Sequence, residues 1–135
     1  MKKTNIEDKY FFNNQKLKRI AIPSSITSIG NNAFNGCYNL SQIIIPPSVT
    51  SIGAGTFQLY VILQQIVIPP QITSIGAYSF YKCKELKQII LPSSITSIGN
   101  DAFAECVNLE QITIPPSITS IRNSAFNSWM HIFER

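Results

Sequence analysis

The sequence predicts an α/β repeat solenoid that is rich in β structure and is built from stacked 23-residue units. Three observations support this fold class. Leucine recurs at a 23-residue spacing, isoleucine or leucine follows it in two further columns, and all eight prolines fall in the next two columns. The repeat has no gap over residues 17–131. The leucine column consists of Leu17, Leu40, Leu63, Leu86 and Leu109.

The repeat divides the chain into three parts. Residues 1–16 are a degenerate N-terminal half-repeat, in which Thr4, Ile6 and Phe11 keep the repeat spacing, and we expect it to act as a cap. Residues 17–131 form five 23-residue repeats, and residues 132–135 start a sixth unit or form a C-terminal cap. No linker or second domain is indicated.

The first segment of each unit predicts a short parallel strand. In the first unit, Ile20 and Ile22 alternate with an outward-facing position, which is the period of a strand. Leu17 lies where the chain enters the strand. Pro23 ends the strand because proline has no N–H to donate. Strands of successive units can therefore pair over about four residues.

The second and third segments predict a short second strand followed by a helical or 3₁₀ turn. The glycine that ends the second segment, such as Gly30, indicates a positive φ or a very tight turn. In the third segment, Ala33, Phe34 and Cys37 have spacings that place them on one face of a helical turn. Asn31 is a candidate N-cap for that turn.

Stacked units should bury continuous columns of apolar side chains. The phenylalanine column predicts an aromatic spine through the core; it consists of Phe11, Phe34, Phe57, Phe80, Phe103 and Phe126. The cysteines Cys37, Cys83 and Cys106 share one column and are interpreted as buried thiols. A disulfide between Cys83 and Cys106 is the alternative, and a metal site is disfavoured because Tyr60 interrupts the column.

Composition and motifs argue against several classes of function. No apolar run reaches the ~18–20 residues of a membrane span, and the N-terminus lacks the apolar stretch of a signal peptide. His131 is the only histidine, the carboxylates form no recurring pair, and no phosphate-binding loop or metal motif is present. We therefore expect no catalytic activity, no cofactor, no bound metal, no nucleic acid and no membrane insertion.

The complete unit, L-x-x-I-x-I-P-x-S-I-T-S-I-G-x-x-A-F-x-x-C, resembles the BspA-like, or Treponema pallidum-type, leucine-rich repeats. The resemblance covers residues 17–131 and the half-unit before them. It implies a right-handed leucine-rich-repeat superhelix with a parallel sheet. It also implies a surface antigen that adheres to host or matrix proteins. The departures are Tyr60 and Trp129 in the cysteine column and Arg122 in the glycine column.

Two outward-facing columns of the first strand are the candidate partner-binding surface. One is rich in glutamine and the next is mostly aliphatic, which fits either strand propensity with amide hydrogen bonds along the ladder or a protein-binding strip. Such a sheet projects only about 300 Å², against roughly 800 Å² per partner in a standard interface, so it should bind weakly by itself. The candidate residues are Gln42, Ile44, Gln65, Val67, Gln88, Ile90, Gln111 and Thr113.

The two ends of the chain are further candidate contact surfaces. Six of the eleven cationic residues lie at positions 1–19, which fits a solvated polar cap or contact with an anionic partner. At the other end, Trp129, Ile132 and Phe133 stand where a further unit would stack. They either fold over the end of the core or form an end-to-end homodimer.

Together these features predict a non-catalytic protein-interaction module. By family resemblance it would bind host or matrix proteins at the cell surface. The alternative is a cytoplasmic scaffold or regulatory adaptor without an extracellular role, which the missing signal peptide favours. The sequence leaves the ligand, the compartment and the oligomeric state open.

Overall fold

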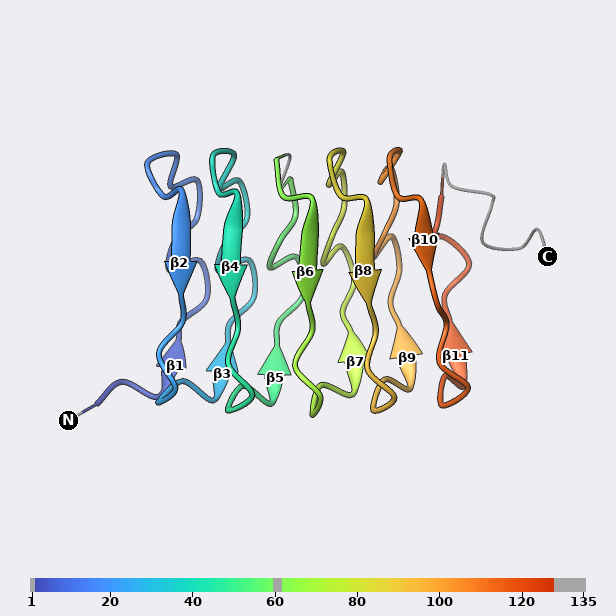
Figure 1. Cartoon of the computed structure of the whole chain (residues 1–135), viewed down its shortest axis with the longest axis horizontal. Helices are drawn as coiled ribbons and strands as arrows, with labels where there is room; N and C mark the ends of the chain where they lie inside the picture. The colour runs from blue at the N-terminus through green and yellow to red at the C-terminus, as the bar shows by residue number, and fades with distance from the viewer. Residues whose placement is uncertain (1, 60–61, 128–135) are drawn as a thin grey trace.

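The chain forms a β-solenoid of about five coils, one for each 23-residue repeat, in a computed structural model that describes residues 2–59 and 62–127. We number the coils by their repeats: coil 1 is 17–39, coil 2 is 40–62, coil 3 is 63–85, coil 4 is 86–108 and coil 5 is 109–131. Residues before coil 1 form a partial N-terminal coil. Figure 1 shows the coils side by side along one axis, with β1 and β2 at one end of the row and β10 and β11 at the other.

Each coil contributes two short strands to two separate faces. The strand face carries the first strand of each coil: β2 (Arg19–Ala21), β4 (Gln42–Ile44), β6 (Gln65–Val67), β8 (Gln88–Ile90) and β10 (Gln111–Ile112). The short-strand face carries β1 (Asn5–Ile6), β3 (Ser28–Ile29), β5 (Ser51–Ile52), β7 (Ser74–Ile75), β9 (Ser97–Ile98) and β11 (Ser120–Ile121).

All strand pairs are parallel and in repeat register. Gln65 lies opposite Gln88, and Gln88 lies opposite Gln111, so equivalent residues of successive coils are neighbours. The strands pair over two or three residues, which is slightly shorter than the expected length of about four residues. In-register stacking of identical residues is therefore confirmed.

Neither face is a continuous sheet, contrary to the expectation of five stacked strands. On the strand face β2 pairs with β4, and β6, β8 and β10 form a second sheet. On the short-strand face β1, β3 and β5 form one sheet and β7, β9 and β11 another. Both interruptions fall between coils 2 and 3, and Figure 1 shows the wider spacing there. We call this joint the seam.

The third segment of each coil is a chain of turns, and the described residues contain no helix. The prediction of a helical or 3₁₀ turn is therefore not supported. In the partial N-terminal coil and in each of coils 1–4, two residues adopt a left-handed conformation with φ between 57° and 78°, which prevents consecutive helical bonds. Backbone N–H groups reach the next coil instead: Phe34 N donates to Thr56 O at 3.1 Å, and Gly36 N donates to Gln58 O at 3.0 Å. We call this third side the turn edge.

The predicted positive φ is wrong for the glycine column that ends the second segment. Glycine is required there for another reason. Gly30, Gly53 and Gly99 have no positive φ; instead, a Cβ atom there would lie 2.5–2.6 Å from a backbone nitrogen of the preceding coil. Glycine therefore permits the close approach of adjacent coils. At Gly76, which faces the seam, the nearest backbone atom is Ala54 Cα at 3.2 Å, so the coils are looser there.

The predicted N-cap role of Asn31 is also wrong. Its Oδ1 accepts a hydrogen bond from Ala54 N of the next coil at 2.9 Å, and Asp8 Oδ1 accepts one from Asn31 N at 2.8 Å. These side chains link one coil to the next and do not cap a turn of their own coil.

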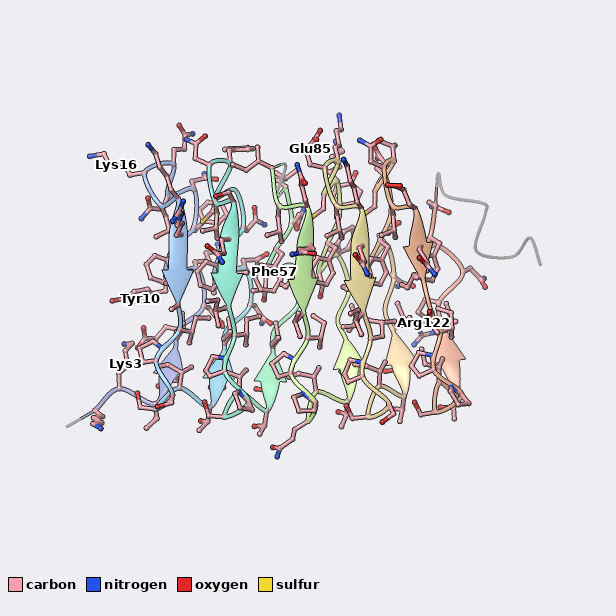
Figure 2. The ribbon with its side chains drawn as sticks, in the orientation of Figure 1. Lys3, Tyr10, Lys16, Phe57, Glu85 and Arg122 are labelled. Carbon is pink, nitrogen blue, oxygen red and sulfur yellow. The ribbon has the colours of Figure 1, made fainter. Side chains whose placement is uncertain are left out.

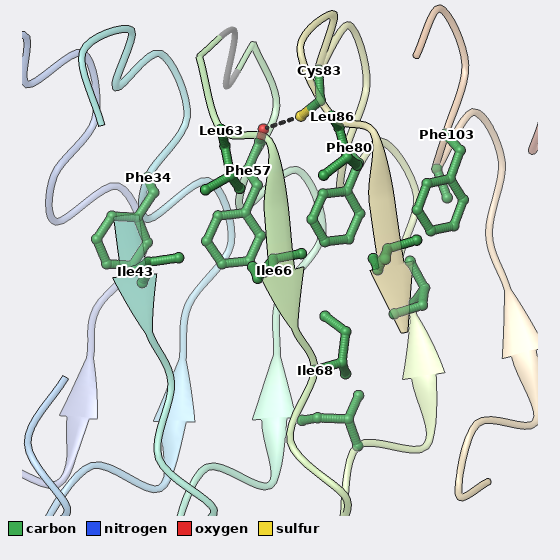
Figure 3. Packing of buried hydrophobic residues seen from close by; sticks show 14 of the residues in the cluster. Phe34, Ile43, Phe57, Leu63, Ile66, Ile68, Phe80, Cys83, Leu86 and Phe103 are labelled. Atoms are coloured by element: carbon green, nitrogen blue, oxygen red, sulfur yellow. Dashed lines mark hydrogen bonds between the residues drawn. The ribbon is translucent and has the colours of Figure 1, made fainter. Parts of the chain in front are cut away.

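The phenylalanine spine is confirmed. Phe34, Phe57, Phe80 and Phe103 are buried, and successive rings stack with centroids 5.3–5.8 Å apart and interplanar angles of 4–17°. Figure 3 shows these rings in a row beneath the strands. The stack crosses the seam without interruption, because Phe57 and Phe80 have a centroid distance of 5.4 Å. One hydrophobic core therefore runs through both halves of the solenoid.

Candidate binding surface

The two predicted outward columns lie on the strand face and are exposed. Gln42, Gln65, Gln88 and Gln111 precede buried isoleucines, and the residues after those isoleucines point to solvent. Ile44, Val67 and Ile90 are 55%, 68% and 59% exposed, and Thr113 is exposed just beyond β10. The strands hold these side chains outward because alternate residues of a strand point to opposite faces. The structure therefore brings all eight predicted residues together on one surface.

The glutamines do not form the amide ladder that strand propensity would explain. Among the described residues, no hydrogen bond links the side chain of Gln42, Gln65, Gln88 or Gln111 to another group of the chain. Their carboxamides are thus available to a partner. Each can donate and accept hydrogen bonds.

The seam opens a groove of about 830 Å³ in the middle of this surface. Ile44 and Val67 line it from β4 and β6, and Gln42 and Gln65 lie beside them. The backbone groups of β4 and β6 that face each other across the seam form no ladder. The lining combines apolar side chains with a larger number of polar and cationic ones, and such convergent polar groups can fix the orientation of a ligand.

The serine column differs between the seam and the other described joints between full coils. Ser48, Ser94 and Ser117 each donate a hydrogen bond from Oγ to a carbonyl oxygen of the preceding coil, at 2.8, 2.5 and 2.6 Å. Coil 3 has Gln71 in this column. Among these joints, the hydrogen bond from a serine Oγ is therefore absent only at the seam, where neither face has paired strands.

The groove is electropositive. Arg19 and Lys87 line it, and none of the carboxylates in the described part of the chain does. Arg19 occupies the glutamine column in coil 1, but neither Arg19 nor Lys87 was among the predicted site residues. The signal was present, because Lys87 belongs to the column directly before the glutamines, which is exposed in the described coils.

The cysteines do not contribute reactive groups. Cys37, Cys83 and Cys106 are buried and free, so the disulfide alternative is wrong. Burial raises the pKa of the Cys37 thiol to about 11 and that of Cys106 to about 12. Each Sγ contacts a carbonyl oxygen of the preceding coil at 3.0–3.1 Å, as Figure 3 shows for Cys83 and Phe57. Within residues 2–59 and 62–127, no cluster of metal-ligating side chains is present.

Other predicted features cannot be placed. Trp129, Ile132 and Phe133, the candidate self-association residues, lie outside the described residues, as does His131. End-to-end pairing through the C-terminus therefore stays a prediction. No helix in the described part of the chain is long and apolar enough to cross a membrane.

Parallel two-faced 23-residue coils with an inward phenylalanine and leucine define a leucine-rich-repeat protein. The model of the BspA type leucine-rich repeat region matches residues 4–132 in six copies. The chain therefore belongs to this family. Repeats of this kind generally serve as binding scaffolds and not as enzymes.

Solved leucine-rich-repeat proteins have the same fold. The leucine-rich repeat protein of T. pallidum shares 29% identity with a TM-score of 0.80, over 89% of this chain and 63% of that one. A Bacteroides ovatus protein shares 33% identity with a TM-score of 0.84, over 92% of this chain and 34% of that one. A leucine-rich cell surface protein of Faecalibacterium prausnitzii shares 33% identity with a TM-score of 0.82, over 93% and 36%.

The chain thus spans between about one third and two thirds of the length of these proteins. No curated protein matches it. The similarity establishes the solenoid and its repeat unit.

Proposed function

We propose that the chain is a non-catalytic protein-binding module that binds its ligand on the strand face, at the seam groove. The observation that carries this proposal is the row of exposed aliphatic side chains beside unpaired glutamines. Ile44, Val67 and Ile90 are each more than half exposed, although they lie in regular strands. Contiguous exposed apolar surface of this kind often marks an interaction site.

The groove adds depth to a surface that is otherwise small. A flat sheet of five short strands offers about 300 Å², whereas the groove lets a ligand side chain contact Ile44 and Val67 from the side. Among the described residues, Arg19 and Lys87 line the same groove without a carboxylate, which favours an acidic segment of the ligand. The resulting affinity should be modest, and several modules in a longer chain would raise it.

The ligand class that we propose is a host or matrix protein bound at the cell surface. This part of the proposal rests on the family and on the similarity to the F. prausnitzii protein, which is a leucine-rich cell surface protein. Protease treatment of intact cells tests the location. Digestion of the protein in intact cells supports surface display, and full protection until lysis contradicts it.

The binding experiment compares two valines with similar exposure. Val67 is 68% exposed on the strand face, and Val107 is 55% exposed on the turn edge. Binding to a panel of purified matrix proteins is measured by surface plasmon resonance for the wild type, Val67→Ser and Val107→Ser. We expect Val67→Ser to weaken binding by about tenfold, because a buried valine contributes roughly 1.5 kcal/mol or more. Val107→Ser should bind as the wild type does.

A fourfold variant extends the test to the whole surface. Replacement of Gln65, Val67, Gln88 and Ile90 by alanine should abolish detectable binding while the thermal unfolding midpoint stays close to that of the wild type. Unaltered binding in this variant would exclude the strand face as the binding surface.

A further inference from the structure

We propose that the N-terminal end of the solenoid is a second interaction surface, which docks on an anionic lipid bilayer without entering its hydrocarbon core. We call this surface the N-terminal cap and define it as residues 2–19. It is separate from the seam groove except for Arg19. The proposal does not depend on the binding function of the strand face.

The cap holds the entire net charge of the protein. Residues 2–19 contain six cationic residues and two carboxylates, whereas residues 20–135 contain five of each. The net charge of +4 is therefore confined to one end of an elongated molecule. Such a charge distribution orients the molecule toward an anionic surface.

Both carboxylates of the cap are already engaged within the protein. Glu7 forms an ion pair with Lys3 at 2.6 Å, and Asp8 accepts a hydrogen bond from Asn31 N at 2.8 Å. Within the described residues, Lys9, Lys16 and Lys18 have no carboxylate partner and are exposed. These three ammonium groups are consequently free to contact lipid phosphates or carboxylates.

Two aromatic side chains accompany these cations. Tyr10 is 53% exposed, although its column holds small, buried residues in the other coils: Ala33, Thr56, Ser79, Ala102 and Ala125. Phe12 is 44% exposed. Figure 2 shows Tyr10 at the N-terminal end of the solenoid together with Lys3 and Lys16. Aromatic rings beside lysines are the combination that anchors proteins at a membrane–water interface.

The ring geometry favours a bilayer over a nucleic acid or a glycan. Lys3 Nζ lies 5.0 Å above the Tyr10 ring, and Lys9 Nζ lies 5.6 Å from the Phe12 ring centroid. Phe11 contacts Tyr10 edge-on at 4.8 Å. Bases and sugars stack on free ring faces, and a lysine ammonium group lies over one face of each ring here. Both side chains nevertheless stay partly exposed, which interfacial anchoring requires. The cap thus fits a headgroup layer, with the rings entering it and the lysines at its phosphates.

Vesicle sedimentation with the full chain tests the cap. Vesicles of phosphatidylcholine with phosphatidylserine should bind the protein, and vesicles of phosphatidylcholine alone should bind it at least about tenfold less. Binding to the anionic vesicles should fall steeply as salt is raised. Equal binding to both vesicles, or none to either, would overturn the proposal.

A matched pair of charge variants locates the site. The cap variant carries Lys9→Gln, Lys16→Gln and Lys18→Gln, and the control carries Lys82→Gln, Lys84→Gln and Arg122→Gln, which all lie outside the seam groove. Lys9 and Lys82 match closely, because both have a positive φ near 60° and both lie over an aromatic ring. The cap variant should lose about a hundredfold in partition coefficient, and the control should lose less than about threefold. Equal losses would assign the binding to overall charge.

Aromatic variants complete the test. Tyr10→Ser with Phe12→Ser should lower the partition coefficient by about tenfold or more without changing its salt dependence, whereas Tyr38→Ser with Tyr78→Ser should leave it unchanged. Binding of heparin or single-stranded DNA that equals vesicle binding and is lost in the same cap variants would show a general polyanion site and overturn the assignment to a bilayer. Unchanged thermal midpoints establish that every variant is folded.

Discussion

The seam and the joint between coils 3 and 4 share one hydrophobic core. They differ in strand pairing, on both the strand face and the short-strand face. At the joint between coils 3 and 4, both ladders are paired and Ser94 Oγ donates to Ile72 O at 2.5 Å. At the seam both ladders stop and Gln71 replaces the serine. The phenylalanine rings nevertheless stack at similar centroid distances, 5.4 Å across the seam and 5.3 Å across the other joint.

The turn edge explains why the seam does not separate the halves. Gly55 N donates to Ala77 O at 2.9 Å, Phe57 N to Ser79 O at 3.0 Å, and the Cys83 thiol contacts Phe57 O at 3.1 Å. The coils therefore stay joined along the turn edge and through the core while the strand faces part. Ring stacking and turn-edge hydrogen bonds therefore hold the coils together where both ladders stop. We expect the small polar side chains between coils to determine whether the ladders form.

The largest expected effect on stability comes from removing a ring of the phenylalanine spine, which crosses both joints. Phe80→Ala should lower the free energy of unfolding by roughly 3–5 kcal/mol, because the fully buried ring leaves a cavity among close-packed neighbours. Phe103→Ala should lower it by a similar amount, since its ring is equally buried. Urea denaturation measures both. A loss below about 1 kcal/mol for Phe80→Ala would contradict a spine that supports the seam.

The repeat made the spine and the outward columns predictable from the sequence, but not the path of the backbone. A side chain that recurs at a fixed spacing, such as Phe57 and Phe80, must stack once the coils are in register. The spacing of Ala33, Phe34 and Cys37 fits a helix as well as a chain of turns, and the left-handed residues of the coils decide between them. Those positions hold Asn, Asp, Lys, Leu, Tyr or Glu as well as Gly, so their composition gives no clear signal.

The seam could not be predicted from the sequence for a different reason. Gln71 is visible as an exception among serines, but the role of that column is a hydrogen bond to the preceding coil, which exists only in three dimensions. Thr50 and Thr73 keep their column at the seam, yet no bond between them is present in the described structure, unlike the bond from Thr96 to Thr73 at 3.2 Å. Conservation of the repeat at one position therefore does not guarantee the contact.

The second prediction concerns the removal of the serine link at the joint between coils 3 and 4. Ser94→Ala removes the bond to the Ile72 carbonyl, so we expect a loss of about 1 kcal/mol, the typical value for a hydrogen bond in a partly buried setting. Amide hydrogen exchange should also rise at Thr96 and Gly99, whose N–H groups bond to Thr73 O and Ile75 O across the joint. Ser93→Ala, at the exposed neighbouring position, serves as the control and should change neither quantity. Unchanged exchange in Ser94→Ala would show that the serine does not hold the faces together.

The third prediction concerns the turn-edge thiols. In the folded state, burial raises the pKa of Cys106 from its ordinary value of 9.0 to about 12. Above about pH 9 the unfolded thiol ionises while the folded one stays protonated, so stability should fall as the pH rises from 9 toward 12. Urea denaturation in reducing buffer at several pH values should show a shallower decline for Cys106→Ala than for the wild type. Parallel curves would contradict the burial of this thiol.

The last prediction concerns a substitution that should restore strand pairing at the seam. Gln71→Ser restores the serine that links every other described joint between full coils, and we expect a gain of about 0.5–1 kcal/mol in the free energy of unfolding as its Oγ bonds to the carbonyl of Val49. Exchange of the Thr73 and Gly76 amides, which have no partner across the seam in the described structure, should slow toward that of Thr96 and Gly99. Closing the seam should also narrow the groove between β4 and β6 and weaken ligand binding on the strand face.

Gln71→Ala separates these effects, because it removes the glutamine without supplying a hydroxyl donor. It should leave the exchange of Thr73 and Gly76 fast and ligand binding unchanged. If Gln71→Ser slows exchange without affecting binding, the ligand contacts the flat strand face and not the groove. If Gln71→Ser does not slow exchange, the seam is set by residues other than Gln71.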